Sequence, residues 1–133
     1  MATTPLIEYD DATPRVKAVY DDIRAVRRTD FINNFWKAMA NQPETLERVW
    51  AQLRDVMGPG VLDPMTKEMV YIAVSIANNC SYCVHSHTAS ARTRGMTEEQ
   101  YQELMAVIAM AHQTNALANG LQVPVDPEFQ IGE

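Results

Sequence analysis

Hydrophobic residues recur every three or four positions along most of the chain, which is the period of an amphipathic α-helix. These stripes predict helices over about 14–28, 31–40, 43–57, 64–77, 80–94 and 98–120. No segment alternates apolar and polar residues for long enough to predict a β-sheet. The pattern therefore predicts an all-α fold.

Capping residues and helix breakers mark the ends of these helices. A cap followed by a first-turn proline starts two of them, at Thr13-Pro14 and at Asp63-Pro64. Asparagine tolerates turn and left-handed conformations, so Asn78-Asn79 predicts a break at which the chain folds back on itself. The proline-containing residues 121–133 are expected to form an extended C-terminal arm.

Length and composition favour one globular domain over residues 1–133, with 47% hydrophobic residues. A net charge of -6 leaves no basic stripe for phosphates, so we expect no nucleic-acid partner. The longest apolar stretch, 69–77, is too short to span a bilayer, and no membrane association is expected. The first residues lack the layout of a secretion signal, which favours a cytoplasmic protein.

The segment from Cys80 to His87 holds the residues best suited to chemistry near neutral pH. On a helix, Cys80 and Cys83 stand at i,i+3 and Cys83 and His87 at i,i+4, so all three can share one face. A helix N-terminus lowers the pKa of a cysteine, and a thiolate can attack a hydroperoxide to give a sulfenic acid. The second thiol would then form a disulfide, which needs an external reductant but no bound cofactor.

Glu68 lies twelve positions before Cys80, too far along a single straight helix to help the thiols. If the chain turns back at Asn78-Asn79, however, an antiparallel pairing brings Glu68 beside His87. The predicted hairpin thus yields a proton relay of Glu68, His87 and Cys83, in which the carboxylate orients the imidazole. Taken alone, Glu68 could instead be a solvated carboxylate near a helix start.

Other interpretations of these residues are weaker. A structural zinc ion needs four ligands and usually draws two pairs from separate segments, whereas no second pair exists here, so no metal is predicted. Tyr82 and His112 are expected to pack against other residues, and His85 is expected to lie at the surface, two positions beyond Cys83.

The spacing of these residues resembles that of the carboxymuconolactone decarboxylase superfamily, specifically its AhpD-like alkyl hydroperoxidase branch. That branch carries a glutamate, a cysteine twelve positions later, and then C-x-x-C-x-x-x-H, which here are Glu68, Cys80, Cys83 and His87. The resemblance is clearest over about 62–95, the motif core.

The resemblance implies an AhpD-like helical bundle that oligomerises through its helices, as a homotrimer or homohexamer. It further implies an antioxidant peroxidase in which Cys83 attacks an organic hydroperoxide, Cys80 resolves the intermediate, and His87 and Glu68 relay protons. A lipoyl-bearing or thioredoxin-like protein is the implied reductant of the Cys80–Cys83 disulfide.

Two other functions remain open from the sequence. The dithiol could serve a redox-sensing or disulfide-exchange module that does not turn over peroxide. A decarboxylase-type enzyme is less favoured, because that branch of the superfamily does not depend on a cysteine pair.

Overall fold

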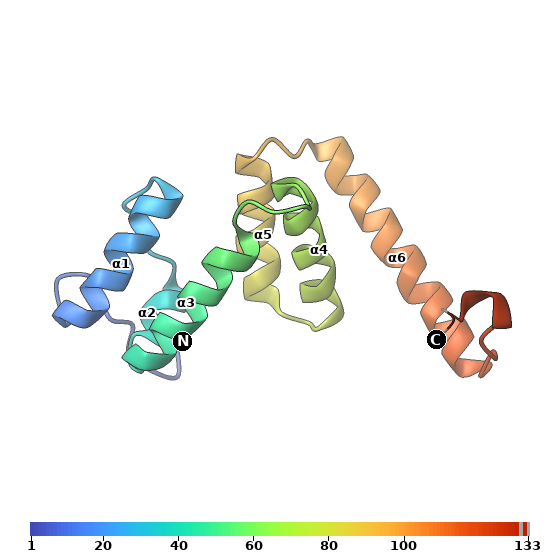
Figure 1. Ribbon diagram of the computed structural model, residues 1–133, viewed down its shortest axis with the longest axis horizontal. Helices are drawn as coiled ribbons and strands as arrows, with labels where there is room; N and C mark the ends of the chain where they lie inside the picture. Colours follow the sequence, from blue (N-terminus) through green and yellow to red (C-terminus); the bar gives the residue numbers. More distant parts are fainter. Residues whose placement is uncertain (131, 133) are drawn as a thin grey trace. The chain divides into compact units, whose positions relative to one another are not determined.

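The computed structural model describes residues 1–130 and Gly132, and this part of the chain contains α-helices and no β-strand. The predicted all-α fold is confirmed. The elements are listed here in chain order: α1 (Pro14–Arg27), α2 (Asn34–Met39), α3 (Pro43–Met57), α4 (Pro64–Ala77), α5 (Ser81–Thr93), α6 (Glu98–Gly120) and the 3-10 helix η1 (Pro127–Phe129) (Figure 1). They form two compact units, residues 1–61 and 62–133.

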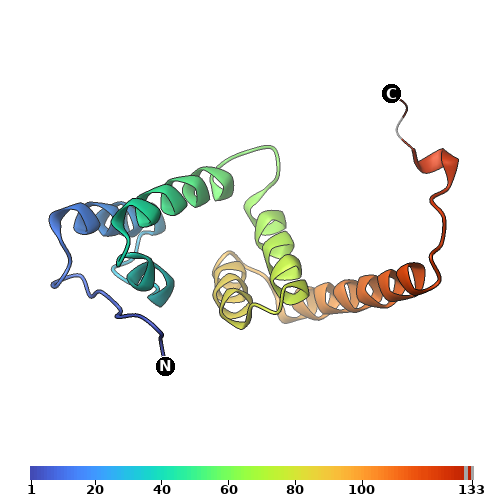
Figure 2. The same ribbon diagram turned by 90° about the horizontal axis from the view of Figure 1, so that it is seen from below.

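Two predicted segments differ from the structure. The helix expected from Phe31 begins only at Asn34, because residue 33 has an extended backbone (φ -63°, ψ 147°) that places it outside the helix as its N-cap. The C-terminal arm is not extended throughout, since η1 forms a turn within it after α6 (Figure 2). Ile131 and Glu133 of the predicted arm lie outside the described residues.

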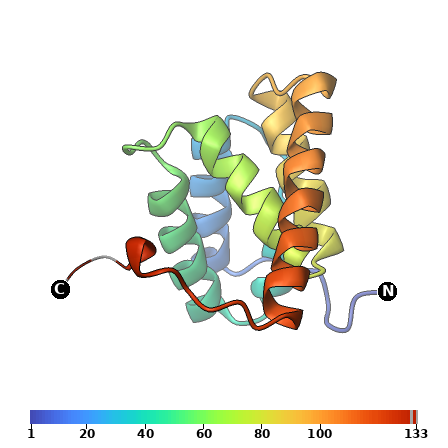
Figure 3. The same ribbon diagram turned by 90° about the vertical axis from the view of Figure 1, so that its right-hand side faces the viewer.

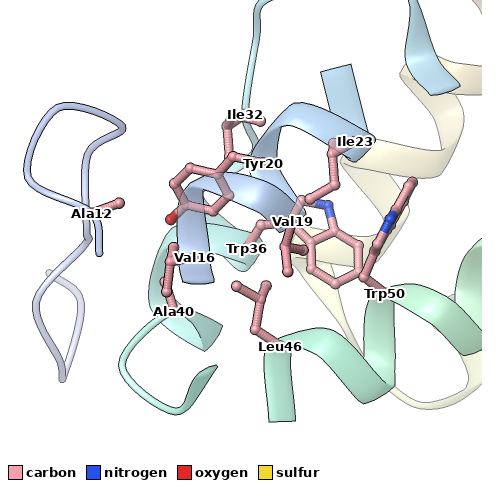
Figure 4. Close-up of a cluster of buried hydrophobic side chains, with 10 residues drawn as sticks. All are labelled: Ala12, Val16, Val19, Tyr20, Ile23, Ile32, Trp36, Ala40, Leu46 and Trp50. Atoms are coloured by element: carbon pink, nitrogen blue, oxygen red, sulfur yellow. The ribbon is translucent and has the colours of Figure 1, made fainter. Parts of the chain in front are cut away.

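The first unit packs α1, α2 and α3 around an aromatic core (Figure 4). Trp36 and Trp50 meet edge to face, with ring centroids 5.4 Å apart at 84°. The indole N–H of Trp50 donates a hydrogen bond of 2.7 Å to Asp22, so the largest side chain of α3 is both buried and satisfied. Tyr20, Ile23 and Leu46 are fully buried around this pair.

The second unit is built on a helical hairpin of α4 and α5, which lie side by side (Figure 1 and Figure 3). Asp63 caps α4 by accepting the Thr66 N–H at 2.9 Å. Asn79 adopts a left-handed conformation (φ 57°), and the Cys80 N–H bonds the Ser75 carbonyl at 2.9 Å. The break predicted at Asn78-Asn79 is confirmed, and it turns the chain back along α4.

The start of α6 closes the core of this unit. A capping box between Thr97 and Gln100 begins the helix, and Tyr101, Leu104 and Met105 pack against a buried cluster. That cluster consists of Ile72, Ala91 and Met96. No helix in the described part of the chain combines the length and apolar character needed to cross a bilayer.

Replacing Leu46 by alanine is expected to lower the free energy of unfolding by about 2–5 kcal/mol, because the fully buried side chain leaves a cavity in the first unit. Urea unfolding followed by circular dichroism measures the change. Val26→Ala, at a half-exposed position of α1, is the control and should change stability by less than about 0.5 kcal/mol. Equal losses in both variants would contradict this assignment of the core.

Candidate active site

The α4–α5 hairpin brings Glu68 and His87 together although they are 19 positions apart in the chain. The Nδ1 atom of His87 lies 2.8 Å from Oε2 of Glu68. The predicted juxtaposition of these two residues is therefore present, whereas their catalytic roles stay a prediction.

Glu68 is a buried carboxylate held by several donors, with only 3% of its surface exposed. Ser90 donates a hydrogen bond of 2.8 Å to Oε1, and the Arg94 guanidinium lies 3.6 Å from the same oxygen. Burial alone would raise the pKa of Glu68, but the bonds from His87 and Ser90 outweigh it and hold the pKa below its ordinary value. The interpretation of Glu68 as a solvated carboxylate is wrong, because α5 covers it.

The contacts of His87 define which of its nitrogens can exchange a proton. An ionised carboxylate can only accept, so the hydrogen bond to Glu68 assigns an N–H to Nδ1 and leaves the Nε2 lone pair free. Tyr71 stacks on one face of the imidazole, with centroids 3.6 Å apart and ring planes 20° from parallel. The imidazole is thus held at one edge and on one face.

The two thiols occupy the first turn of α5, and both are free and half-buried. Cys80 is the N-cap residue, and its sulfur accepts the backbone N–H of Cys83 at 3.3 Å. Hydrogen bonds from the Cys83 side chain and N–H lower the pKa of Cys80. Burial, and then the bond to Cys80, raise the pKa of Cys83 to about 11. The N-cap sulfur is therefore the one that ionises first.

Sequence reasoning missed three residues of this site, namely Tyr71, Ser90 and Arg94. Tyr71 follows Glu68 by three positions, and Ser90 follows His87 by three, so each lies one helical turn from a residue that was predicted. Arg94 lies two turns beyond His87. Reading the same helix faces further along the chain would have found them.

The remaining candidates lie outside the site. His85 is exposed, as predicted, with Nδ1 2.8 Å from the Ser81 carbonyl. The packing role expected for His112 is wrong within this chain, since its side chain is exposed on α6. Tyr82 is 44% exposed on α5, and its packing role stays a prediction. In residues 1–130 and 132, no three or more His, Cys, Asp or Glu side chains gather in a way that could hold a metal ion.

Comparison with known proteins places this arrangement in a family. The family model described as "Carboxymuconolactone decarboxylase family" matches residues 43–126, which is more than half of the chain. The chain belongs to the carboxymuconolactone decarboxylase family. A solved structure from Rhodospirillum rubrum, the core of an alkylhydroperoxidase AhpD, is 53% identical, covers 99% of both chains and superposes with a TM-score of 0.96.

The curated relatives of this protein include AhpD proteins. The alkyl hydroperoxide reductase AhpD of Solibacter usitatus is 38% identical over 65 residues, which are 49% of this chain and 35% of that protein. An uncharacterised protein of the cox locus in Paracoccus denitrificans is 36% identical over 70 residues, 47% of this chain and 63% of that protein. The chain thus spans less than two thirds of these relatives. The predicted AhpD-like branch is confirmed, and the match to the solved core extends over both units, as in a single all-α domain.

Ser90→Ala should lower the free energy of unfolding of this protein by about 1–3 kcal/mol, because the buried carboxylate of Glu68 loses a hydrogen-bond donor. The pKa of Glu68 is lowered in the folded state, so its contribution is present above the unfolded-state pKa and lost as pH falls through the folded-state value. The variant raises that folded-state pKa. Acid unfolding followed by circular dichroism should therefore begin at higher pH than in the wild type.

The control for this experiment is Thr93→Ala, which removes an exposed hydroxyl of α5 that bonds only the Ala89 carbonyl. It should leave the acid transition in place. A transition that moves equally in both variants would show that Ser90 does not act through Glu68.

Brief alkylation of the reduced protein near pH 7 should label Cys80 before Cys83. The lowered pKa of Cys80 gives it the larger thiolate fraction, and the thiolate is the reactive form. Peptide mass spectrometry after a short pulse of iodoacetamide measures both sites. Faster labelling of Cys83 would contradict the order of ionisation.

Proposed function

We propose that this protein is an antioxidant thiol peroxidase of the alkyl hydroperoxide reductase kind, which cycles Cys80 and Cys83 between dithiol and disulfide. The observation that carries the proposal is the buried Glu68–His87 pair, since His87 lies on α5, the helix whose N-cap and first turn hold the thiols. The AhpD names of the relatives support the same chemistry. An organic hydroperoxide is the proposed substrate.

The proposed reaction starts with the transfer of the Cys83 proton to Nε2 of His87, which follows Cys83 by one helical turn. The Cys83 thiolate attacks the O–O bond, giving a sulfenic acid and an alkoxide, and the alkoxide takes the proton from the His87 imidazolium and leaves as the alcohol. Glu68 stabilises the imidazolium formed in between. Only the thiolate is nucleophilic, so the raised pKa of Cys83 is the reason that the proposed step needs His87 as a base.

Cys80 completes the proposed cycle. Its thiolate attacks the sulfenic sulfur, a disulfide forms, and the hydroxyl group leaves as water after protonation. An external dithiol, from a lipoyl-bearing or thioredoxin-like partner, then reduces the disulfide by thiol exchange. The lowered pKa of Cys80 makes it the better leaving group in that exchange.

A second candidate is a redox-sensing or disulfide-exchange module without peroxide turnover. The lowered pKa of the N-cap thiol favours this candidate, because exchange needs a thiolate but no proton relay. The buried Glu68–His87 pair has no role in it, which is why we place it second.

We further infer that the chain self-associates through its helices. In α6 only Ile108 is buried among the described residues, whereas Val107, Met110 and Leu117 of the same helix are exposed. An apolar surface of this kind is typical of a subunit interface. A trimer or hexamer, and a cytoplasmic location, stay predictions.

The peroxidase proposal predicts multiple turnovers of an organic hydroperoxide in the presence of excess dihydrolipoamide. The rate should fall by at least about 100-fold in Cys83→Ser, because the proposed nucleophile is removed. Peroxide loss measured against time, with protein as the limiting component, tests this. If the wild type consumes no more than one equivalent of peroxide per protein, the peroxidase proposal is wrong and the redox-sensing module is favoured.

Cys80→Ser is the matched variant in the same assay. It should retain one round of peroxide reduction and stop as a sulfenic acid on Cys83, which dimedone captures and mass spectrometry locates. A dimedone adduct on Cys80 in Cys83→Ser, and none on Cys83 in Cys80→Ser, would reverse the two roles.

A further inference from the structure

Tyr71 is an aromatic side chain in direct contact with the imidazole of His87. It lies on α4 one helical turn after Glu68, so the carboxylate and the phenol ring approach His87 from the same helix. Glu68 engages the Nδ1 edge, and Tyr71 covers one face at a centroid distance of 3.6 Å. Two residues of α4 therefore contact the imidazole, Glu68 in the plane of the ring and Tyr71 on its face.

The geometry of the stack restrains the orientation of the imidazole. The rings of Tyr71 and His87 are only 20° from parallel, with centroids 3.6 Å apart. At this distance the two rings are in van der Waals contact, so the imidazole cannot tilt toward Tyr71 without a steric clash.

The hydroxyl of Tyr71 remains a neutral group. Burial raises the pKa of Tyr71, and the negative charges of Cys83, Cys80 and Glu68 raise it further. The phenol therefore keeps its proton while the thiols ionise. The ring, rather than a phenolate, is what His87 meets throughout the proposed cycle.

We propose that Tyr71 is a positioning residue that fixes the plane of the neutral His87 imidazole, so that the Nε2 lone pair stays available to the thiol pair. This inference rests on the proposed proton relay, since it assigns no chemistry to Tyr71 itself. Among the described residues, the titratable groups recorded in contact with His87 are Glu68 and Tyr71 of α4, and Arg94 at the C-cap of α5 lies 3.6 Å from Glu68. The ion pair recorded between α5 and α6, Arg92 with Glu98, lies at the far end of α5.

The test uses nuclear magnetic resonance on the oxidised protein, in which the thiols do not titrate. In the wild type, nitrogen shifts should report one tautomer of His87 with the proton on Nδ1. In Tyr71→Leu we expect a mixture of tautomers, because the imidazole loses the ring that holds its plane and can turn away from Glu68. Tyr71→Phe retains the ring and should behave as the wild type.

Two internal controls accompany these variants. His85 and His112 are exposed and should give the same signals in every protein. Tyr101→Leu removes a half-buried tyrosine whose ring faces Arg92 at 4.9 Å, and it should leave the His87 signals unchanged. A folded Tyr71→Leu protein in which His87 keeps the wild-type tautomer would overturn the proposal.

The wild type provides a measurement that does not depend on the folding of any variant. A ring stacked at this distance should shift the carbon-bound protons of His87 upfield relative to those of His85 and His112. Absence of that shift would contradict the stacking of Tyr71 on His87, and therefore the proposal.

Measuring peroxide turnover distinguishes failure of the peroxidase proposal from failure of the positioning role of Tyr71. A wild type that shows the stack and the single tautomer but no turnover would refute the peroxidase and leave the positioning role of Tyr71 intact. If the wild type turns over, Tyr71→Leu should lower kcat at least about threefold with little change in KM, because the base and not the substrate site is altered.

Discussion

The burial of one carboxylate organises the second unit of this protein. Glu68 lies between α4 and α5, where an unpaired charge would be strongly unfavourable. His87, Ser90 and Arg94 offset that cost, and all three belong to α5 or its C-cap. The register of the two helices is consequently tied to the partners of a single side chain, and so is the position of the imidazole relative to the thiols.

The same hairpin separates two thiols that are close in sequence into different environments. Cys80 precedes the helix and its sulfur accepts the backbone N–H of Cys83, whereas Cys83 lies in the first turn and is more affected by burial. A three-residue spacing is enough to create this difference because the capping position and the first turn are physically distinct. The two thiols thus differ in pKa before any substrate binds.

Much of this arrangement could be predicted from the sequence, because its determinants are local. Caps at Thr13, Asp63 and Thr97 start α1, α4 and α6 as predicted, and the left-handed Asn79 makes the turn that Asn78-Asn79 indicated. The pairing of Glu68 with His87 followed from that turn. Side chains that depend on the contact between helices could not be located in this way, which is why Tyr71 and Ser90 were missed. His112 was misjudged because an apolar stretch does not reveal which face of α6 is covered.

The compactness of the site along the chain has a consequence for how it forms during folding. The residues that meet at Glu68 are at most 26 positions from it, and the two closest contacts join residues 19 and 22 positions apart. Contacts of such short sequence separation cost little loop-closure entropy and are typical of fast-folding helical proteins. The constellation around Glu68 can therefore assemble within one nascent hairpin, as soon as α5 has left the ribosome.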